Sequence, residues 1–110
     1  MMKQNRNYDL NKWVMLPQEV EGTYRFDGKM YATSNAADFI SFDDFRLIIS
    51  SIREFVRIHD GADYLFVFKN ERLGRKIFVI DNLNDQMKSS SDSRFILEHN
   101  YFTIMMEEDY

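Results

Sequence analysis

Apolar residues recur at three- and four-residue steps between Ser41 and Ile58, and this spacing predicts one long amphipathic helix. Six of them fall within about 120° of one another on a helical wheel, namely Phe45, Ile48, Ile49, Ile52, Phe55 and Val56. Ser41 with Asp44 fits an N-terminal capping box, and Gly61 supplies a stop. We expect this helix to bury its apolar stripe and to organise the rest of the chain.

Two other patterns predict β-hairpins. Residues 20–33 alternate on either side of Asp27-Gly28, a dipeptide typical of a two-residue type I′ turn. Residues 64–69 (YLFVFK) and 76–81 (KIFVID) are apolar runs rich in aromatic and β-branched residues, which suit two paired strands. In YLFVFK both the even-numbered and the odd-numbered positions are largely apolar, so apolar side chains point to both sides of the strand. We therefore expect this second hairpin to lie centrally with both faces covered.

The remaining segments carry weaker signals. A strand is predicted near residues 13–16, a single turn within residues 35–40, and a surface loop at residues 82–93. Residues 94–106 fit either a helix or two strands around His99-Asn100, and we favour the helix. The predicted fold is α+β: a small antiparallel sheet built from two hairpins packed on one central amphipathic helix, with a C-terminal helix or strand.

The composition bounds the class of protein. A chain of 110 residues suffices for one core, so we expect a flexible N-terminal arm at residues 1–12 and a single domain at residues 13–110. The sequence has no cysteine, no signal peptide and no stretch apolar enough for a membrane span, which favours the cytoplasm. We expect no cofactor and no metal. A net charge of −4 argues against a general nucleic-acid binder.

Three arginines lie on one flank of the predicted helix and form the first candidate partner-binding site. Arg46, Arg53 and Arg57 fall within about 40° on the wheel and suit phosphates or a partner's carboxylates. A solvated helix shoulder beside a buried stripe has the same pattern. On the opposite side, Leu47 and Ile58 would contact another element or a second chain, so a homodimer stays open.

Two further charged groups are candidates for partner binding. The turn of the second hairpin is bracketed by four cations, Lys69, Arg72, Arg75 and Lys76. They suit a nucleic-acid groove or an acidic protein surface, and equally the protection of exposed strands. An acidic tail of Glu107, Glu108 and Asp109 ends in Tyr110, and it suits either a basic groove on a partner or a solvated terminus.

Catalytic signals are weak. Each histidine has carboxylates close in sequence, Asp60 and Asp63 beside His59 and Glu98 beside His99. Such pairs can perform acid–base chemistry, but their spacing matches no metal motif, and histidines in turns commonly have no function. Asp81 ends an apolar strand, where active sites collect carboxylates, yet Asp81-Asn82 is also ordinary turn chemistry.

Four features follow one another in the second half of the chain: Val79-Ile80-Asp81, the polar loop 89–93, Thr103-Ile104-Met105-Met106 and the closing Asp109-Tyr110. With them the chain resembles an uncharacterised family of small bacterial proteins, domain of unknown function 3768. The resemblance covers about half of the chain. It implies no activity, only a setting among bacterial and mobile-element genes.

These observations favour a non-enzymatic protein that occupies a surface on a larger protein partner. The sharpest version is a phage- or plasmid-encoded inhibitor of a host defence nuclease, of the anti-CRISPR or anti-restriction type. The alternatives are an immunity or antitoxin protein, a nucleic-acid-binding protein that uses the basic turn at residues 69–76, and a small hydrolase that uses His59 or His99.

Overall fold

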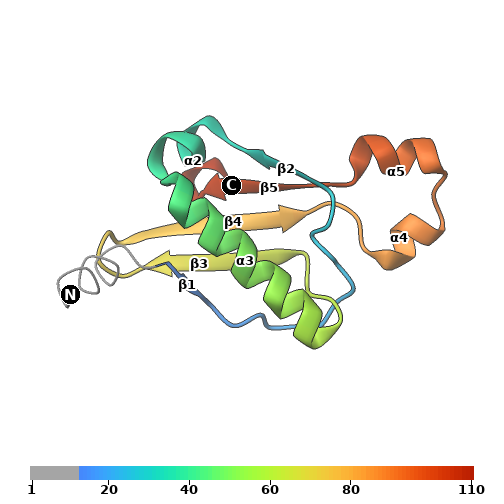
Figure 1. Ribbon diagram of the computed structural model, residues 1–110, viewed down its shortest axis with the longest axis horizontal. Coiled ribbons are helices and arrows are strands. Elements are labelled where there is room, and N and C mark those ends of the chain that lie inside the picture. Colours follow the sequence, from blue (N-terminus) through green and yellow to red (C-terminus); the bar gives the residue numbers. More distant parts are fainter. Residues whose placement is uncertain (1–12) are drawn as a thin grey trace.

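The computed structural model describes residues 13–110, which form a mixed five-stranded sheet with two helices packed on one face and two beyond its end (Figure 1). The strands are β1 (Val14–Met15), β2 (Lys29–Ala32), β3 (Leu65–Asn70), β4 (Arg75–Asp81) and β5 (Tyr101–Met106), in the spatial order β1-β3-β4-β5-β2. The helices are α2 (Ser34–Phe39), α3 (Phe42–His59), α4 (Asp85–Ser89) and α5 (Ser93–His99), and a 3₁₀ turn, η1 (Glu107–Asp109), follows β5. The predicted α+β class with a central helix is confirmed. The predicted arm at residues 1–12 lies outside the described residues.

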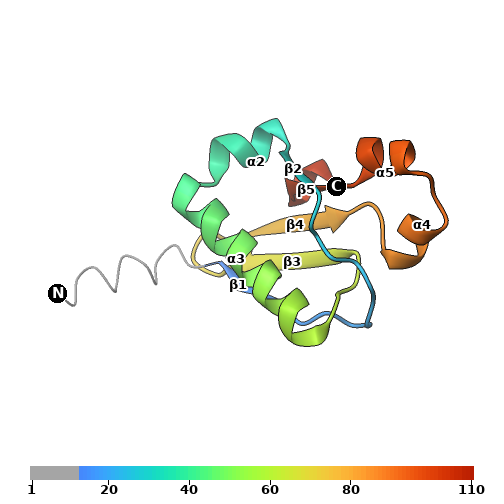
Figure 2. The ribbon, with the colours of Figure 1, turned by 45° about the vertical axis from the view of Figure 1, so that its right-hand side comes forward.

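Helix α3 forms where the apolar spacing predicts it and crosses one face of the sheet obliquely (Figures 1 and 2). The Ser41 hydroxyl accepts a hydrogen bond from the Asp44 N–H at 3.1 Å, which satisfies one free donor of the first turn. At the other end Asp60 adopts a left-handed conformation with a φ of 55°. Ile48 and Ile52 are each 1% exposed, so the core lies between α3 and the sheet.

The second predicted hairpin is confirmed, since β3 and β4 pair in antiparallel fashion in the middle of the sheet. Its two faces differ in burial. Inward residues such as Phe66 and Val79 are fully buried, whereas outward residues such as Val67 and Ile80 are only half-buried. Our expectation that both faces are covered is wrong for the described residues, because α2 and α3 both contribute to the core on the same face.

The first predicted hairpin does not form. Residues 20–28 run past the end of α3 to the far edge of the sheet, where β2 pairs in parallel with β5 (Figure 1). A Cβ atom at Gly28 would lie 2.1 Å from the Asn100 carbonyl oxygen, so this glycine permits a close approach of two backbones instead of a hairpin turn. Phe26 is buried against Phe66 and Phe102, which explains the apolar pattern that suggested a strand.

The C-terminal segment contains both of the predicted alternatives. Ser93–His99 is helical and Tyr101–Met106 is a strand, with Asn100 between them. The predicted loop at residues 82–93 includes the short helix α4, and α4 and α5 project beyond the end of the sheet (Figure 1). Among residues 13–110, none of the helices combines the length and the apolar composition needed to cross a membrane.

Candidate functional site

The outward face of the sheet is the main candidate, and we call it the open face. In β3, β4 and β5 every outward side chain is half-buried, while nearly all inward side chains are fully buried. This alternation is typical of a sheet that is covered on one side. The outward strand positions are Val14, Lys29, Tyr31, Leu65, Val67, Lys69, Lys76, Phe78, Ile80, Tyr101, Thr103 and Met105.

Strand register arranges these side chains in rows across the sheet. One apolar row joins Val67, Phe78 and Met105, and the next joins Leu65, Ile80, Thr103 and Tyr31. A basic row with Lys69 opposite Lys76 lies on one side of these two rows, and Lys29 lies beside Tyr101 on the other side. The open face therefore has an apolar middle with lysines on both flanks, and its outward strand positions include no carboxylate.

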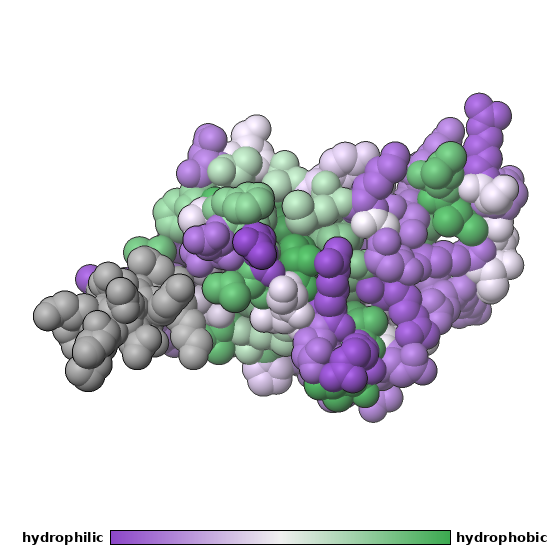
Figure 3. Space-filling view, in the orientation of Figure 1, coloured by the Kyte–Doolittle hydropathy of each residue, from purple (hydrophilic) through white to green (hydrophobic). Residues whose placement is uncertain are grey.

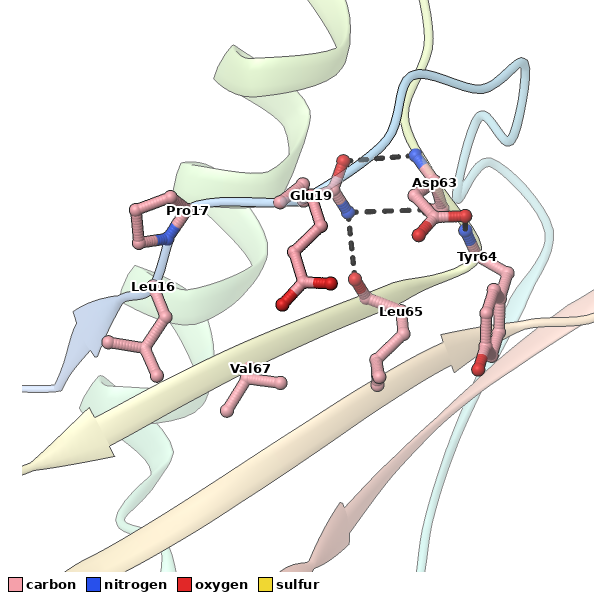
Figure 4. A pocket seen from close by; sticks show the side chains of 8 residues that line it. Leu16, Pro17, Glu19, Asp63, Tyr64, Leu65 and Val67 are labelled. Carbon is pink, nitrogen blue, oxygen red and sulfur yellow. Dashed lines mark hydrogen bonds between the residues drawn. The ribbon is translucent and has the colours of Figure 1, made fainter.

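A hollow of about 320 Å³ opens at the β1 side of the open face (Figure 4). It is lined by Leu16, Pro17, Gln18, Glu19, Asp63, Tyr64, Leu65 and Val67. The Gln18 amide donates to the Leu65 carbonyl at 2.8 Å and accepts from the Asp63 N–H at 2.9 Å, so this side chain takes the place of a neighbouring strand. The aliphatic side chains of the lining suit an apolar group, and the exposed Glu19 carboxylate disfavours an anion.

The acidic tail is folded back onto the protein. The Asp109 carboxylate accepts hydrogen bonds from the Thr33 hydroxyl and the Asn35 amide, each at 2.6 Å. The hydrogen bond from Thr33 lowers the pKa of Asp109, and the bond from Asn35 adds to this effect. The ring of Tyr110 packs edge-on against Phe78 at 5.0 Å. In the tail that we predicted to bind a partner, Asp109 therefore stabilises the fold and Tyr110 lies on the open face.

The four cations of the predicted basic turn do not project together. Lys69 and Lys76 lie opposite each other on the open face, and Lys69 forms a 3.3 Å ion pair with Glu71. Arg75 forms a 2.8 Å ion pair with Glu108, and its guanidinium lies 4.5 Å from the centre of the Phe39 ring. Arg72 is exposed in the turn. The structure thus joins Arg75 and Glu108, two candidates that sequence reasoning had assigned to separate sites.

Arg46, Arg53 and Arg57, which we call the arginine ridge, are exposed along α3. Arg57 forms a 2.6 Å ion pair with Glu54 one turn earlier, whereas Arg46 and Arg53 are exposed on the same helix. Leu47 and Ile58 are also exposed, at 58% and 59%. Figure 3 looks onto this side, where apolar residues gather over α2 and the start of α3, hydrophilic residues interrupt them, and a separate apolar patch lies over α5 at the upper right. Phe42, the first residue of α3, is 76% exposed. The α3 side therefore has a mixed surface with an apolar area near α2.

The candidate catalytic residues occupy structural positions. His59 and His99 stack on Phe55 and Phe95 of their own helices, with ring centres 4.2 and 4.3 Å apart. Asp81 is 3% exposed, and its carboxylate accepts from the Phe26 and Asn82 N–H groups at 2.9 Å each. Burial raises the pKa of Asp81 in spite of these bonds. Within residues 13–110, no three His, Asp or Glu side chains gather as a metal site requires.

A charged clamp holds the long connection that leads to β2. Arg25 donates to the Asp85 carboxylate with a shortest distance of 2.6 Å and to Asp60 at 2.7 Å. The hydrogen bond from Arg25 lowers the pKa of Asp85. Asp60 follows α3 and Asp85 begins α4, so the clamp ties both helices to the connection. Arg25, Asp60 and Asp85 pair with one another within the protein, which suits a structural role.

Sequence reasoning missed the open face, although a signal for it was present. Both parities of YLFVFK are apolar, and we interpreted this as two covered faces. The structure covers one face with α3, so the residues of the second apolar parity, Leu65 and Val67, are half-buried. Comparison of the chain with protein-family models, with curated proteins and with solved structures found no match. The resemblance of the C-terminal half to domain of unknown function 3768 stays a prediction.

Proposed function

We propose that the chain is a non-enzymatic protein-binding protein that docks on a larger protein through the open face. One observation supports this function most: the outward residues of the three longest strands are largely apolar yet only half-buried. Contiguous exposed apolar surface commonly marks a site of interaction with another protein. Half-exposed aromatic residues such as Phe78 and Tyr101 are also the residue types enriched at interfaces.

The engagement of the candidate catalytic groups supports a non-enzymatic reading. Asp81 receives two backbone hydrogen bonds in the interior, which suits a structural role. His59 and His99 are exposed and stack on phenylalanines of their own helices, and among the described residues neither imidazole is hydrogen-bonded to a carboxylate as in an acid–base pair. Binding therefore accounts for the exposed apolar side chains better than catalysis does.

The sharper proposal is a phage- or plasmid-encoded inhibitor of a host defence nuclease, with an immunity or antitoxin protein as the alternative. The charges of the open face limit where such an inhibitor would bind. Lys29, Lys69 and Lys76 favour an acidic surface, whereas the substrate groove of a nuclease has to attract phosphates. If the partner is a nuclease, we expect the contact to lie outside its substrate groove.

Affinity capture from the native cell tests the binding function. The wild-type chain is compared with Phe78→Glu, which places a charge in the middle of the open face, and with a triple reversal of Arg46, Arg53 and Arg57 to Glu on the α3 side. We expect the wild type and the triple variant to retain the same protein and Phe78→Glu to lose it while remaining folded by circular dichroism. If only the triple variant loses the partner, the arginine ridge is the binding site and the open face is not.

Deletion of residues 107–110 is unsuitable as a binding test. It removes the Asp109 contacts with Thr33 and Asn35 and the ion pair between Glu108 and Arg75. We therefore expect this deletion to lower the stability of the fold. Any loss of binding would then follow from the loss of structure as readily as from a lost contact.

A further inference from the structure

We propose that the open face receives an amphipathic helix of the partner, with its apolar stripe along the two apolar rows and acidic residues on both flanks. This inference rests on the proposed protein-binding function and specifies the chemistry of the partner. The apolar rows run between the lysine pair Lys69–Lys76 and the single Lys29. Flanking carboxylates on a helix would lie over these lysines.

The dimensions of the rows suit a short helix. Strands lie about 4.8 Å apart, so the row that crosses β3, β4, β5 and β2 spans about 14 Å. About ten helical residues cover that length. Residues two positions apart on a strand are separated by about 7 Å, so the flanking lysines lie about 7 Å outside the apolar rows. The two flanks are therefore about 21 Å apart. A helix with its side chains is about 10–12 Å wide, so the lysine side chains have to extend about 5 Å toward it on each side to meet its carboxylates.

A helix already packs across the strands of this sheet, because α3 crosses them obliquely on the inner face (Figure 1). A helix along the apolar rows would cross the strands at a steeper angle than α3 does. A second helix on the open face would complete a three-layer arrangement, which is a common way to bury both faces of a sheet. The hollow beside Leu65 and Val67 lies at one end of the apolar rows and would receive an apolar side chain from the helix (Figure 4).

Charge argues against two occupants from within the same sequence. A second copy packed face to face would bring Lys29, Lys69 and Lys76 of one molecule near the same lysines of the other, and within residues 13–110 only Lys69 of the three has an ion-pair partner, Glu71. Residues 1–12 contain Lys3, Arg6 and Lys12 but only one acidic residue, Asp9, so their charge has the same sign as the open face. Like charges brought together at an interface disfavour the complex.

Single-stranded nucleic acid would also be attracted by the lysines, but the middle of the face suits it less well. Bases stack on aromatic rings, and the two apolar rows contain mainly aliphatic side chains beside Phe78 and Tyr31. Both rings already pack edge-on against a tyrosine, Phe78 against Tyr110 and Tyr31 against Tyr101. An acidic helix uses the aliphatic rows as well as the lysines, and we therefore favour it.

The test uses a synthetic peptide of about 14 residues with a leucine stripe and glutamates on both flanks, titrated into the full ¹⁵N-labelled protein. A control peptide of the same length has lysines in place of the glutamates. We expect the glutamate peptide to shift the amide signals of Val67, Phe78 and Ile80 and the lysine peptide to bind at least about tenfold more weakly. Lys69→Glu with Lys76→Glu should reverse this preference, whereas Arg53→Glu on α3 should leave it unchanged.

The proposal is overturned if the two peptides bind equally, if the shifts lie on α3, or if the glutamate peptide gives no shifts at millimolar concentration. It is also overturned if a single-stranded oligonucleotide shifts the open-face signals at lower concentration than the peptide does, since the face would then bind nucleic acid. If the peptides fail while Phe78→Glu still loses the captured protein, the helix assignment is wrong and the proposed function stands. If Phe78→Glu retains that protein, the proposed function itself fails.

Discussion

Two isoleucines on β4 allow a matched test of whether the open face is uncovered in solution. Ile77 points inward and is 0% exposed, whereas Ile80 points outward and is half-buried. Both lie within the same strand and both have partners on β3 and β5. Ile77→Ala and Ile80→Ala therefore remove the same atoms at a similar loss of strand propensity, and they differ mainly in what covers the side chain.

The expected losses of unfolding free energy differ by about twofold. Ile77→Ala leaves a cavity in the core, and such substitutions lower the free energy of unfolding by about 2–5 kcal/mol, so we expect about 4 kcal/mol. Ile80→Ala removes methyl and methylene groups that are partly exposed. At about 0.8 kcal/mol for each fully buried group, three groups that are mostly buried give about 1.5–2 kcal/mol without a cavity. The midpoint of thermal unfolding should therefore differ by about 8 °C between the variants.

Urea unfolding followed by far-ultraviolet circular dichroism measures both free energies. The dependence on urea concentration should have the same slope in both variants if the unfolded states are alike. Equal losses of stability in the two variants would refute the reasoning, because Ile80 would then be covered in solution. Repeating the measurement at a protein concentration about ten times higher identifies the cover: a second copy makes the stability depend on concentration, and a segment of the same chain does not.

Three further predictions concern the contacts that hold the long connection. Asp81→Ala should lower the free energy of unfolding by about 2 kcal/mol because it leaves a buried backbone N–H unpaired, whereas the exposed Asp38→Ala should change it by less than about 0.5 kcal/mol; a loss as small for Asp81 would contradict its role. Arg25→Gln should destabilise the protein at neutral pH. Its deficit should shrink as the pH falls below about 4, because the pKa of Asp85 is lowered in the folded state and the stability linked to it is lost on protonation; a deficit constant with pH counts against this clamp. Gly28→Ala should cost more than about 2 kcal/mol by thermal melting, since its Cβ atom would overlap a backbone carbonyl, and near-native stability would argue against parallel pairing of β2 with β5.

Helix α3 could be predicted from the sequence because the information for it is local. The three- and four-residue spacing of the apolar residues, the Ser41 cap and the stop near Gly61 all lie within about twenty residues. The β3–β4 hairpin is local in the same sense, since a short turn joins two apolar runs. In both elements the residues that form the contacts are near neighbours in the chain.

Strand β2 was misassigned because its pairing depends on distant residues. Lys29–Ala32 pairs with Tyr101–Ile104, about seventy positions away, and no local signal names that partner. Asp27-Gly28 fits a hairpin turn by composition, while the actual requirement at Gly28 is space for the carbonyl of Asn100. The same dipeptide suits a hairpin turn and a close approach of two backbones, so the local sequence does not distinguish these two structures.

The open face was only half predictable. The alternation of Leu65 and Val67 with Phe66 and Phe68 assigned each residue to the correct side of the sheet. Whether a second layer covers the outward side depends on the number of helices and on the side of the sheet where they pack, which is a property of the whole fold. The prediction that the four cations of the basic turn project together is wrong for a related reason. Neighbouring strand residues such as Arg75 and Lys76 point to opposite faces of the sheet.

Photo-crosslinking in the native cell tests the central claim most directly. Benzoylphenylalanine replaces Phe78 on the open face in one variant and Arg53 on α3 in the other. We predict that the probe at position 78 links the chain to one partner protein and that the probe at position 53 does not. An adduct formed from position 53 alone would contradict the claim that the open face is the surface through which this protein binds.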